Sequence, residues 1–506
     1  MILRNTKDPE ILLITEGTYP YVRGGVSSWI NQLIQNIPER RFGVIFIGSD
    51  PSHYGEPKYT YPDNLVYLET HYIFESSQSN PSATQKRSMK REFIEEIQAL
   101  HAWISAPEKN SMPASLKDLS FFTKKITYED FLYSEEAWHY INETYMKHCP
   151  DIPFLDYFWT LRSIHTPLWK LADIARTLPD ARLIHTPSTG YAGLLSALTS
   201  MFRDRPMVLT EHGIYTKERK IDLLTADWIT YHKPTLLKEP EEENYIKKMW
   251  VNFFERIGRV CYNQANPIIS LYHEARQMQV LFGAPEEKTR IIPNGIDVDT
   301  FTPLISQNPP SPVITLIGRV VSIKDIKTFI RAMRITVTKI PETQGWIVGP
   351  TDENPDYYTE CLHMVEALGL EKNVKFLGFR NICDILPQTR LLTLTSISEG
   401  MPLVILEGFA AGLPCVATDV GSCRELIEGG LNEEDRNIGA AGAIVPIANP
   451  QALSDAYISY IKEDTLWREA RERGLRRVKR FYRQESVFRT YDEIYSSLIK
   501  KESSET

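Results

Sequence analysis

The chain is 506 residues long and carries 57 Lys and Arg residues against 65 Asp and Glu, a formal net charge of −8 at pH 7. Hydrophobic residues make up 42% of it and charged residues 24%, which is typical of a folded globular protein and excludes a mostly disordered chain. The acidic balance argues against general nucleic-acid binding, which usually requires a basic surface. The length corresponds to about three domains of average size, or to two large ones.

Neither a membrane span nor a secretory leader is expected. No apolar run approaches the ~20 residues that a membrane-spanning helix needs, and the N-terminal segment lacks an apolar stretch followed by a small-residue cleavage site. The cysteines form no C-x-x-C pair and no metal-ligand spacing, so we expect reduced thiols in a cytoplasmic protein, each a small buried hydrophobe. They are Cys149, Cys261, Cys361, Cys383, Cys415 and Cys423.

The first half of the chain alternates strand-like and helix-like segments, which predicts a parallel sheet covered by helices. The segments are strands at 10–16, 42–49, 64–70, 181–186, 206–213 and 266–270 and helices at 26–37 and 190–202. Between about 75 and 165 the sequence is charged, aromatic and helix-like, which predicts a helical insertion in a first domain of residues 1–300. The insertion either covers an edge of this domain or docks a partner.

A proline-rich stretch at 302–312 introduces a second alternating region, which predicts a second doubly wound sheet over 301–480. Its segments are strands at 313–318, 344–349, 373–378, 391–396 and 414–419 and helices at 326–337, 355–368 and 403–411. We expect 481–506 to be a helix that packs back on the first domain, and the basic stretch 471–483 to belong to that helical tail or to form a docking surface. Ligands of open α/β sheets bind beyond the carboxyl ends of the strands, so the site is expected in a cleft between the two domains.

The most specific motif is ISEGMPLVILEGFAAGLPCVAT at 397–418. Pro402 suits the first turn of a helix, and the N–H groups left free at a helix N-terminus suit a phosphate. Glu407, inside the helix, can accept hydrogen bonds from a ribose diol, and Glu399 can meet the hydroxyls of a sugar. A capping carboxylate and a solvated helix glutamate are the alternative, but the whole string favours a ligand site. The residues at this N-terminus are Gly400, Met401, Pro402 and Leu403.

Two cations follow the first strand of the second domain in GRVVSIKD, 318–325. Arg319 and Lys324 on one loop suit a diphosphate, because arginine binds two oxygens at once and lysine adds a point charge. They would also stabilise negative charge on a leaving diphosphate. Taken alone, such a pair is equally compatible with solvated loop cations.

Three weaker motifs lie on other loops. Gly24 and Gly25 precede the first predicted helix, where adjacent glycines let the backbone approach a ligand. His212 follows a strand and can meet a sugar hydroxyl when neutral or an anion when charged. His185 follows another strand, and we expect it to be structural. The D-x-D pair that begins at Asp297 is interpreted as a turn rather than a metal–nucleotide site.

Taken together, these motifs resemble the retaining glycosyltransferases of the GT4 family, which have the GT-B fold. The resemblance rests on S-x-S-E-G-M-P with Glu407, on G-R-x-x-x-x-K, on the PNGID-V-D-x-F segment and on ATDVGSCRELI at 417–427. Within that family the segment 16–34, the helical insertion and TEHGIYTKER at 210–219 resemble the PelF group, which acts in Pel exopolysaccharide assembly.

The resemblance implies a nucleotide-sugar donor, UDP-glucose for PelF-like members, and a glycan acceptor. Arg319 and Lys324 then correspond to the diphosphate clamp, Glu407 to the ribose-binding glutamate and Glu399 to the residue near the donor sugar. Gly24 and Gly25 belong to the glycine-rich loop, where Gly25 faces the diphosphate. The catalytic set that it implies is His212, Glu399, Arg319 and Lys324.

No metal and no further cofactor is implied, because the cationic loop and the helix dipole take the place of a metal. The implied partners are membrane-embedded Pel synthase subunits, which would recruit the protein to the inner face of the cytoplasmic membrane. Two other functions stay open: a nucleotide-sugar 2-epimerase of the same architecture, and a non-catalytic nucleotide-sugar sensor or scaffold of a membrane synthase.

Overall fold

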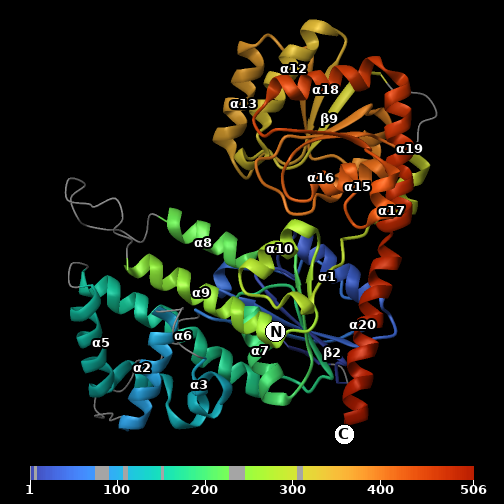
Figure 1. Ribbon diagram of the computed structural model, residues 1–506. Coiled ribbons are helices and arrows are strands. Elements are labelled where there is room, and N and C mark those ends of the chain that lie inside the picture. Colours follow the sequence, from blue (N-terminus) through green and yellow to red (C-terminus); the bar gives the residue numbers. More distant parts are fainter. Residues whose placement is uncertain are drawn as a thin grey trace. The chain divides into compact units, whose positions relative to one another are not determined.

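The computed structural model describes residues 2–4, 8–74, 90–105, 112–149, 153–226, 245–304 and 311–505. The chain divides into two compact units (Figure 1). Unit 1 comprises Met1–Ile269, Met278–Arg290 and Asp492–Thr506, and unit 2 comprises Ser270–Gln277 and Ile291–Tyr491. Parts of the predicted insertion and of the proline-rich stretch, namely 75–89, 106–111, 150–152 and 305–310, lie outside the described residues.

Unit 1 is built on an eight-stranded sheet in the order β1-β4-β3-β2-β5-β6-β7-β8. β1 runs antiparallel to β4, whereas β4, β3, β2, β5 and β6 pair in parallel. β2 and β3 are buried along almost their whole length, as expected of central strands covered on both faces. The strands are β1 Ile2–Arg4, β2 Ile11–Glu16, β3 Phe42–Gly48, β4 Leu65–Tyr72, β5 Leu183–Thr186, β6 Met207–Glu211, β7 Ile268–Ser270 and β8 Thr289–Ile291.

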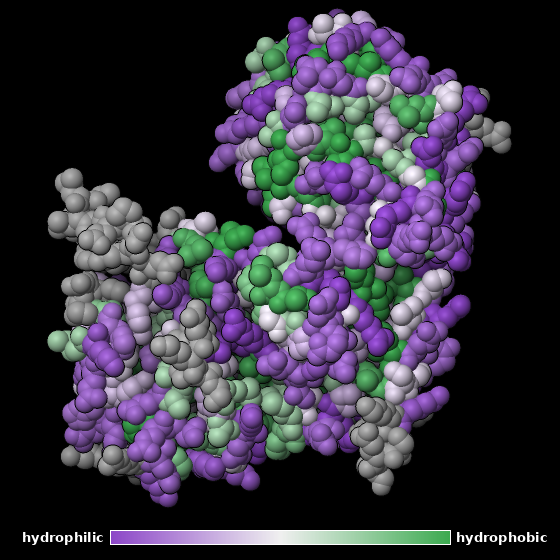
Figure 2. All heavy atoms as spheres, viewed as in Figure 1, coloured by the Kyte–Doolittle hydropathy of each residue, from purple (hydrophilic) through white to green (hydrophobic). Residues whose placement is uncertain are grey.

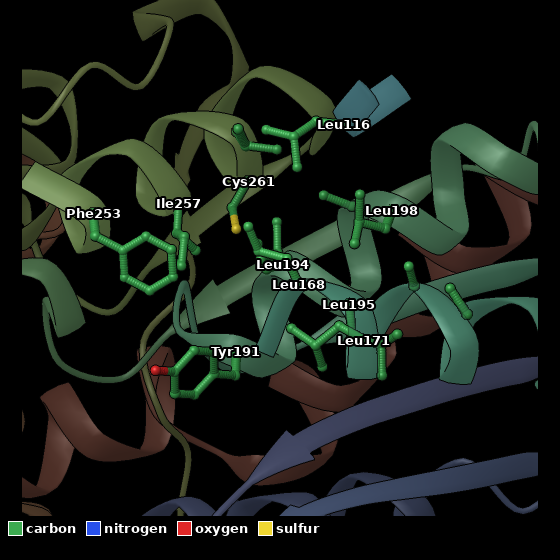
Figure 3. Packing of buried hydrophobic residues seen from close by; sticks show 14 of the residues in the cluster. Leu116, Leu168, Leu171, Tyr191, Leu194, Leu195, Leu198, Phe253, Ile257 and Cys261 are labelled. Carbon is green, nitrogen blue, oxygen red and sulfur yellow. The ribbon is translucent and has the colours of Figure 1, made fainter. Parts of the chain in front are cut away.

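The helices of unit 1 enclose a hydrophobic core that extends from the sheet into the predicted insertion. Figure 3 shows leucines of α6 and α7 packed together with Phe253, Ile257 and Cys261 of α9. The helices are α1 Gly25–Asn36, α2 Arg91–Ser105, α3 Ala114–Lys117, α4 Tyr128–Tyr133, α5 Glu135–His148, α6 Phe154–Thr177, α7 Tyr191–Arg203, α8 Tyr215–Thr225, α9 Tyr245–Gln264 and α10 His273–Leu281, whose first residues group with unit 2.

Wherever it is described, the stretch predicted as an insertion is mainly helical, and its last helix differs from expectation in length. α6 runs on to Thr177, well beyond the predicted end near 165. Its buried residues Leu161, Ile164, Leu168 and Leu171 follow helical spacing and belong to the core of unit 1. The insertion is therefore joined to the sheet domain by one continuous helix.

Unit 2 is built on a six-stranded sheet in the order β11-β10-β9-β12-β13-β14, with every neighbouring pair parallel. Its strands are β9 Val313–Ile317, β10 Gln344–Val348, β11 Val374–Gly378, β12 Leu391–Leu394, β13 Cys415–Thr418 and β14 Gly442–Val445. Its helices are α11 Val298–Phe301, α12 Ile326–Lys339, α13 Pro355–Ala367, α14 Ile382–Ile385, α15 Leu403–Ala410, α16 Cys423–Glu428, α17 Glu433–Ile438, α18 Pro450–Lys462 and α19 Asp464–Phe481.

The predicted fold class, two parallel sheets wound with helices, is confirmed. The sequence did not indicate β1, β8 and β14, which are three or four residues long and lie at or next to sheet edges. β14 begins inside the glycine-rich run at 439–443, so its short apolar stretch is not recognisable as a strand from the sequence.

Several cations of the basic stretch 471–483 are paired with carboxylates of unit 2. Arg477 is fully buried in an ion pair with Asp435, at 2.7 Å between Nε and Oδ1, and Arg480 pairs with Glu434. Arg483 pairs with Asp299, while the neighbouring Asp297 caps α11 as expected of a turn residue. Arg477 and Arg480 thus attach α19 to α17 of unit 2, and Arg483, just before the last helix, is paired with α11.

The last helix, α20 Gln484–Glu505, begins in unit 2 and continues into unit 1. Within unit 1, Arg40 donates to Asp492 at 2.7 Å. The hydroxyl of Tyr495 lies 2.7 Å from Nδ1 of His185, whose Nε2 lies 2.9 Å from Oγ1 of Thr210. His185 is thus a buried structural residue, as expected.

No helix among the described residues is long and apolar enough to cross a membrane. The face drawn in Figure 2 is mostly hydrophilic, with small hydrophobic patches. All six cysteines carry free thiols, and five of them are buried. Cys383 is the exception to the expected burial, because it lies at the half-exposed start of the short helix α14.

Candidate functional site

The loops that follow β9 and β12 lie side by side in unit 2, because these strands are neighbours in the sheet. The backbone N–H of Ile397 donates to the carbonyl of Ile323 at 2.8 Å, and the Thr395 hydroxyl donates to the carbonyl of Lys324 at 2.8 Å. These bonds hold the loop that carries the predicted cations against the loop that carries Glu399.

Lys324 and Glu399 form a direct ion pair, with Nζ 2.5 Å from Oε1. Both side chains are largely buried, with exposed fractions of 18% and 12%. The same oxygen, Oε1 of Glu399, also accepts a short hydrogen bond from the Ser396 hydroxyl, so a second donor holds the carboxylate in place. The carboxylate of Glu399 fixes the position of the Lys324 ammonium group. The pair thereby holds a positive charge just beyond the C-terminal ends of the strands.

The backbone around Glu399 is held by a close approach of the loop after β13. Gly421 has a φ of +53°, and an added Cβ there would lie 2.2 Å from the carbonyl oxygen of Glu399. The N–H of Ser422 donates to the carbonyl of Gly400 at 3.0 Å. A side chain at 421 would therefore displace the loop that leads into α15.

Arg319 lies on the same loop as Lys324 but has a different partner. Its guanidinium pairs with both carboxylate oxygens of Glu353, in the loop after β10, at 2.6 and 2.7 Å. Both side chains are more than half exposed, so the pair contributes little stability and exchanges readily. Glu353 was not singled out from the sequence, although its position after a parallel strand would have indicated it.

The N-terminus of α15 has no side-chain cap, with Pro402 at the N-cap position. Its first N–H groups therefore point out of the helix end without a capping oxygen, as a phosphate site requires. Met401, just before this helix, accepts a hydrogen bond on its sulfur from the N–H of Asn294 at 3.3 Å. This contact helps to fix the backbone of Gly400, Met401, Pro402 and Leu403, which leads into α15.

Glu407 is the fifth residue of α15, and no hydrogen bond or ion pair of its carboxylate is found among the described residues. Burial raises its pKa to about 7. A half-buried carboxyl without a hydrogen-bonding partner is costly to ionise. Two hydroxyl groups of a ligand could donate the hydrogen bonds that the Glu407 carboxylate does not receive from the protein.

Unit 1 contains a cavity of about 810 Å³ at the carboxyl ends of its central strands. Residues that follow β2, β3, β4, β5 and β6 contribute to it, together with α6, α8 and α9. Its size is typical of a small-molecule site. The aromatic side chains among its lining residues are Tyr54, Phe74, Trp159, Tyr191, Tyr215, Trp250 and Phe254.

His212 lines this cavity and is held edge-on against Trp29, with ring centroids 4.6 Å apart. Burial lowers its pKa to about 4, so its imidazole is neutral near pH 7. Its Nε2 is buried and has no hydrogen-bond partner among the described residues. Of the two roles that the sequence left open, the neutral hydrogen-bonding one fits this environment.

Two carboxylates of unit 1 that the sequence analysis did not select lie beside His212. Glu16, at the end of β2, accepts from the N–H of Ala192 and from the hydroxyl of Tyr215, both at 3.1 Å. Glu211, at the end of β6, is fully buried among donors from the loop before α7, from α9 and from α10, and burial raises its pKa to about 6. Their positions at the ends of parallel strands could have indicated them as site residues.

Gly24 and Gly25 are exposed at the start of α1, which also has no side-chain cap. A Cβ added to either would have no heavy atom within 4 Å. Val26, the next residue, lines the cavity. The predicted site residues therefore fall into two sets, one in each unit: Gly24, Gly25 and His212 in unit 1, and Arg319, Lys324, Glu399–Leu403 and Glu407 in unit 2.

Two family models match the chain. Residues 9–287, more than half of the chain, match a family described as "Domain of unknown function (DUF3492)". Residues 311–463 match "Glycosyl transferases group 1". The first model covers β2 to β7 of the unit 1 sheet and the insertion. The second covers β9 to α18 of unit 2, including both loops around Lys324 and Glu399.

Among curated proteins, N-acetyl-alpha-D-glucosaminyl L-malate synthase of Bacillus anthracis is 28% identical over 179 residues, which are 35% of this chain and 43% of that protein. A UDP-Gal:alpha-D-GlcNAc-diphosphoundecaprenol alpha-1,3-galactosyltransferase of Escherichia coli is 30% identical over 180 residues, 32% of this chain and 44% of that protein. The chain thus spans less than half the length of these two relatives.

Solved structures resemble the whole chain in fold. HepE of Anabaena, solved in complex with UDP, superposes with a TM-score of 0.57 at 16% identity and covers 96% of this chain and 100% of that one. Sucrose-phosphate synthase of Thermosynechococcus elongatus superposes with a TM-score of 0.55 at 15% identity, with 97% and 100% covered. At these identities the likeness establishes the GT-B fold alone.

Proposed function

Because the chain belongs to the family described as a domain of unknown function (DUF3492) and carries a group 1 glycosyltransferase domain, we propose that it is a glycosyltransferase. It transfers a hexose, glucose in the first instance, from a UDP-sugar to a glycan acceptor. The observation that carries the proposal is the Lys324–Glu399 pair beside the uncapped N-terminus of α15, with the unpartnered Glu407 further along the same helix.

The donor fits these groups in order along unit 2. Glu407 accepts from the ribose hydroxyls, the N–H groups at the start of α15 meet the diphosphate, and Lys324 neutralises it. Arg319 leaves Glu353 for the diphosphate, an exchange that costs little because the pair is exposed. The UDP-glucose complex solved for Anabaena HepE supports UDP-glucose as the first donor to test.

In the reaction the bond between the sugar C1 and the UDP oxygen breaks, and a bond between C1 and an acceptor oxygen forms. The acceptor proton moves to the leaving phosphate, which Lys324 and Arg319 stabilise as its charge develops. We propose GT4-type retention of anomeric configuration by this front-face route, without a metal. Product anomers resolved by NMR, and activity in EDTA, test these two points.

A role in Pel-type exopolysaccharide synthesis is part of the proposal and rests on the resemblance of 16–34 and 210–219. Membrane-embedded synthase subunits would then be the partners, and the cytoplasmic face of the membrane the place of work. Co-purification with such subunits tests this part separately from the chemistry.

The test of the chemistry is UDP release from UDP-glucose, together with UDP binding by calorimetry. Arg319→Ala and Lys324→Ala should each abolish most transfer and weaken UDP binding. If both variants keep full transfer and full UDP affinity, the donor site is misassigned. An epimerised sugar formed from donor alone would favour the 2-epimerase, and UDP binding without turnover under any condition would favour the sensor.

A further inference from the structure

We propose that the cavity of unit 1 binds the acceptor as an uncharged saccharide, and that α6 of the helical insertion supplies the wall that selects it. This inference rests on the proposed function and gives the insertion a role in it. Three residues from one turn of α6, Trp159, Thr160 and Ser163, line the cavity. The sequence of the insertion is compatible with an edge cover or with a docking surface.

α6 is long enough to pack in the core of unit 1 at one end and to line the cavity at the other. Its C-terminal part packs into the core through Leu168 and Leu171, which face leucines of α7 in Figure 3. Its N-terminal part reaches the cavity with Trp159. Since the buried part fixes the helix, the indole is presented on a rigid element rather than on a loop.

The aromatic lining suits the apolar face of a sugar ring. Trp250 and Phe254 lie one turn apart on α9 and both line the cavity. Their rings stack on each other with centroids 6.0 Å apart and an interplanar angle of 17°. Trp159 is 58% exposed, so an aromatic face stays available to a ligand. A pyranose presents C–H groups on its faces and hydroxyls at its rim, which matches aromatic walls with a few polar groups between them.

The polar groups of the cavity favour a ligand that donates hydrogen bonds. Glu16 and Glu218 are acceptors when ionised, and the buried Nε2 of His212 lacks a partner among the described residues. The hydroxyls of Ser49 and Ser163 add further polar groups to the lining. Sugar hydroxyls can satisfy these groups, whereas a purely hydrocarbon ligand would leave them unmatched.

The charges of the lining disfavour an anionic acceptor. Two carboxylates, Glu16 and Glu218, line the cavity against one cation, Arg219. The Arg219 guanidinium lies over the rings of Tyr215 and Phe254, and it is 3.7 Å from the carboxylate of Asp222. A phosphate in the cavity would therefore face two carboxylates with one shared cation.

The experiment compares two exposed tryptophans of the insertion. Trp159→Ala removes the proposed wall, and Trp138→Ala is the matched control, because Trp138 is 48% exposed on α5 and does not line the cavity. The acceptors to be tested are cellobiose, maltose and N,N′-diacetylchitobiose as uncharged saccharides, glucose 6-phosphate as an anion and farnesyl phosphate as a lipid. UDP affinity and UDP-glucose hydrolysis without acceptor are measured alongside.

The expected result is transfer to at least one uncharged saccharide, with KM for it raised about tenfold or more by Trp159→Ala and unchanged by Trp138→Ala. UDP affinity and hydrolysis should stay at wild-type levels in both variants. If Trp159→Ala lowers the melting temperature, Thr160→Val, which removes one hydroxyl at nearly constant volume, takes its place.

The inference is overturned if Trp159→Ala and Trp138→Ala behave alike, or if glucose 6-phosphate or farnesyl phosphate is the better acceptor. Failure of the proposed function looks different, because the wild-type protein would then cleave no UDP-sugar with or without an acceptor. The two failures are therefore separable in one set of assays.

Discussion

Glu407 is a carboxylate whose surroundings predict a pH-dependent affinity. Its pKa of about 7 means that it is protonated below that pH and ionised above it. In the proposed donor site the ionised form accepts from both ribose hydroxyls, so ligand binding there would be linked to loss of the proton. Uridine affinity should therefore increase about tenfold between pH 6 and pH 8 and then level off.

Uridine is the appropriate ligand because it carries no phosphate that titrates in this range. Glu407→Gln serves as the control: its affinity for uridine should be lower and should not change with pH. A wild-type affinity that is constant from pH 6 to pH 8 in calorimetry would contradict the assignment of Glu407 to the ribose.

The exposed pair of Arg319 and Glu353 predicts a gain of affinity on removing a charge. Glu353→Gln releases the guanidinium from its carboxylate, so UDP should bind equally well or up to about fivefold tighter. Arg319→Ala should weaken UDP binding about tenfold or more. Calorimetry measures the UDP affinity of both variants. Weaker binding by Glu353→Gln would mean that Glu353 itself contacts the donor.

Helix α19 carries two arginines that test the difference between a buried and an exposed ion pair. Arg477 is fully buried with Asp435 and also donates to three backbone carbonyls, whereas Arg480 pairs with Glu434 at the surface. Arg477→Ala should lower the free energy of unfolding of unit 2 by about 3–5 kcal/mol, because it leaves a buried carboxylate unpaired.

Arg480→Ala, on the same helix, should change that free energy by less than about 1 kcal/mol. Denaturant unfolding followed by circular dichroism measures both. Equal losses in the two variants would show that the buried pair has no special role in holding α19.

Among the secondary-structure elements, the central parallel strands and their helices were predicted well from the sequence, and the short edge strands poorly. The runs ILLI of β2 and FGVIFIG of β3 contain no polar side chain because both faces of the sheet are covered, and that pattern is visible in one sequence. β14 has only four residues next to glycines, so neither periodicity nor length distinguishes it from a loop.

For the site, the sequence indicated residues with motif context and missed those defined by three-dimensional neighbours. Lys324 and Glu399 were both selected, but their direct contact depends on the adjacency of β9 and β12, which the sequence order does not give. Glu353 has no motif around it, and Glu16 begins the segment 16–34 without being distinguished within it as a site residue. The end of α6 at Thr177 and the place of Trp159 in the cavity depend on tertiary packing.

At the scale of the whole molecule, the end of the chain belongs to the unit in which the chain begins. Removal of Asp492–Thr506 deletes Asp492, which pairs with Arg40, and the buried Tyr495, whose hydroxyl lies beside His185. Arg40 keeps its ion pair with Glu10, and His185 keeps its contact with Thr210. We expect this truncation to lower the melting temperature of unit 1 in scanning calorimetry. Tyr495→Phe, which removes only the hydroxyl next to His185, should have a smaller effect in the same direction.

An unchanged melting temperature in the truncated protein would show that the segment contributes nothing to unit 1. The comparison with Tyr495→Phe separates loss of the hydrogen bond from loss of the packed helix. Because unit 2 keeps all of its residues, its own unfolding serves as the internal reference.

The central claim is that unit 2 holds a UDP-sugar for transfer, with Lys324 at the diphosphate. Its most direct test is the rate of UDP release from UDP-glucose in the presence of an uncharged saccharide, measured for the wild-type protein and Lys324→Ala. We predict release by the wild type and a rate at least about 100-fold lower in the variant, because the leaving diphosphate loses its buried cation. Equal rates in the two proteins, or no release by the wild type with any saccharide, would contradict the claim.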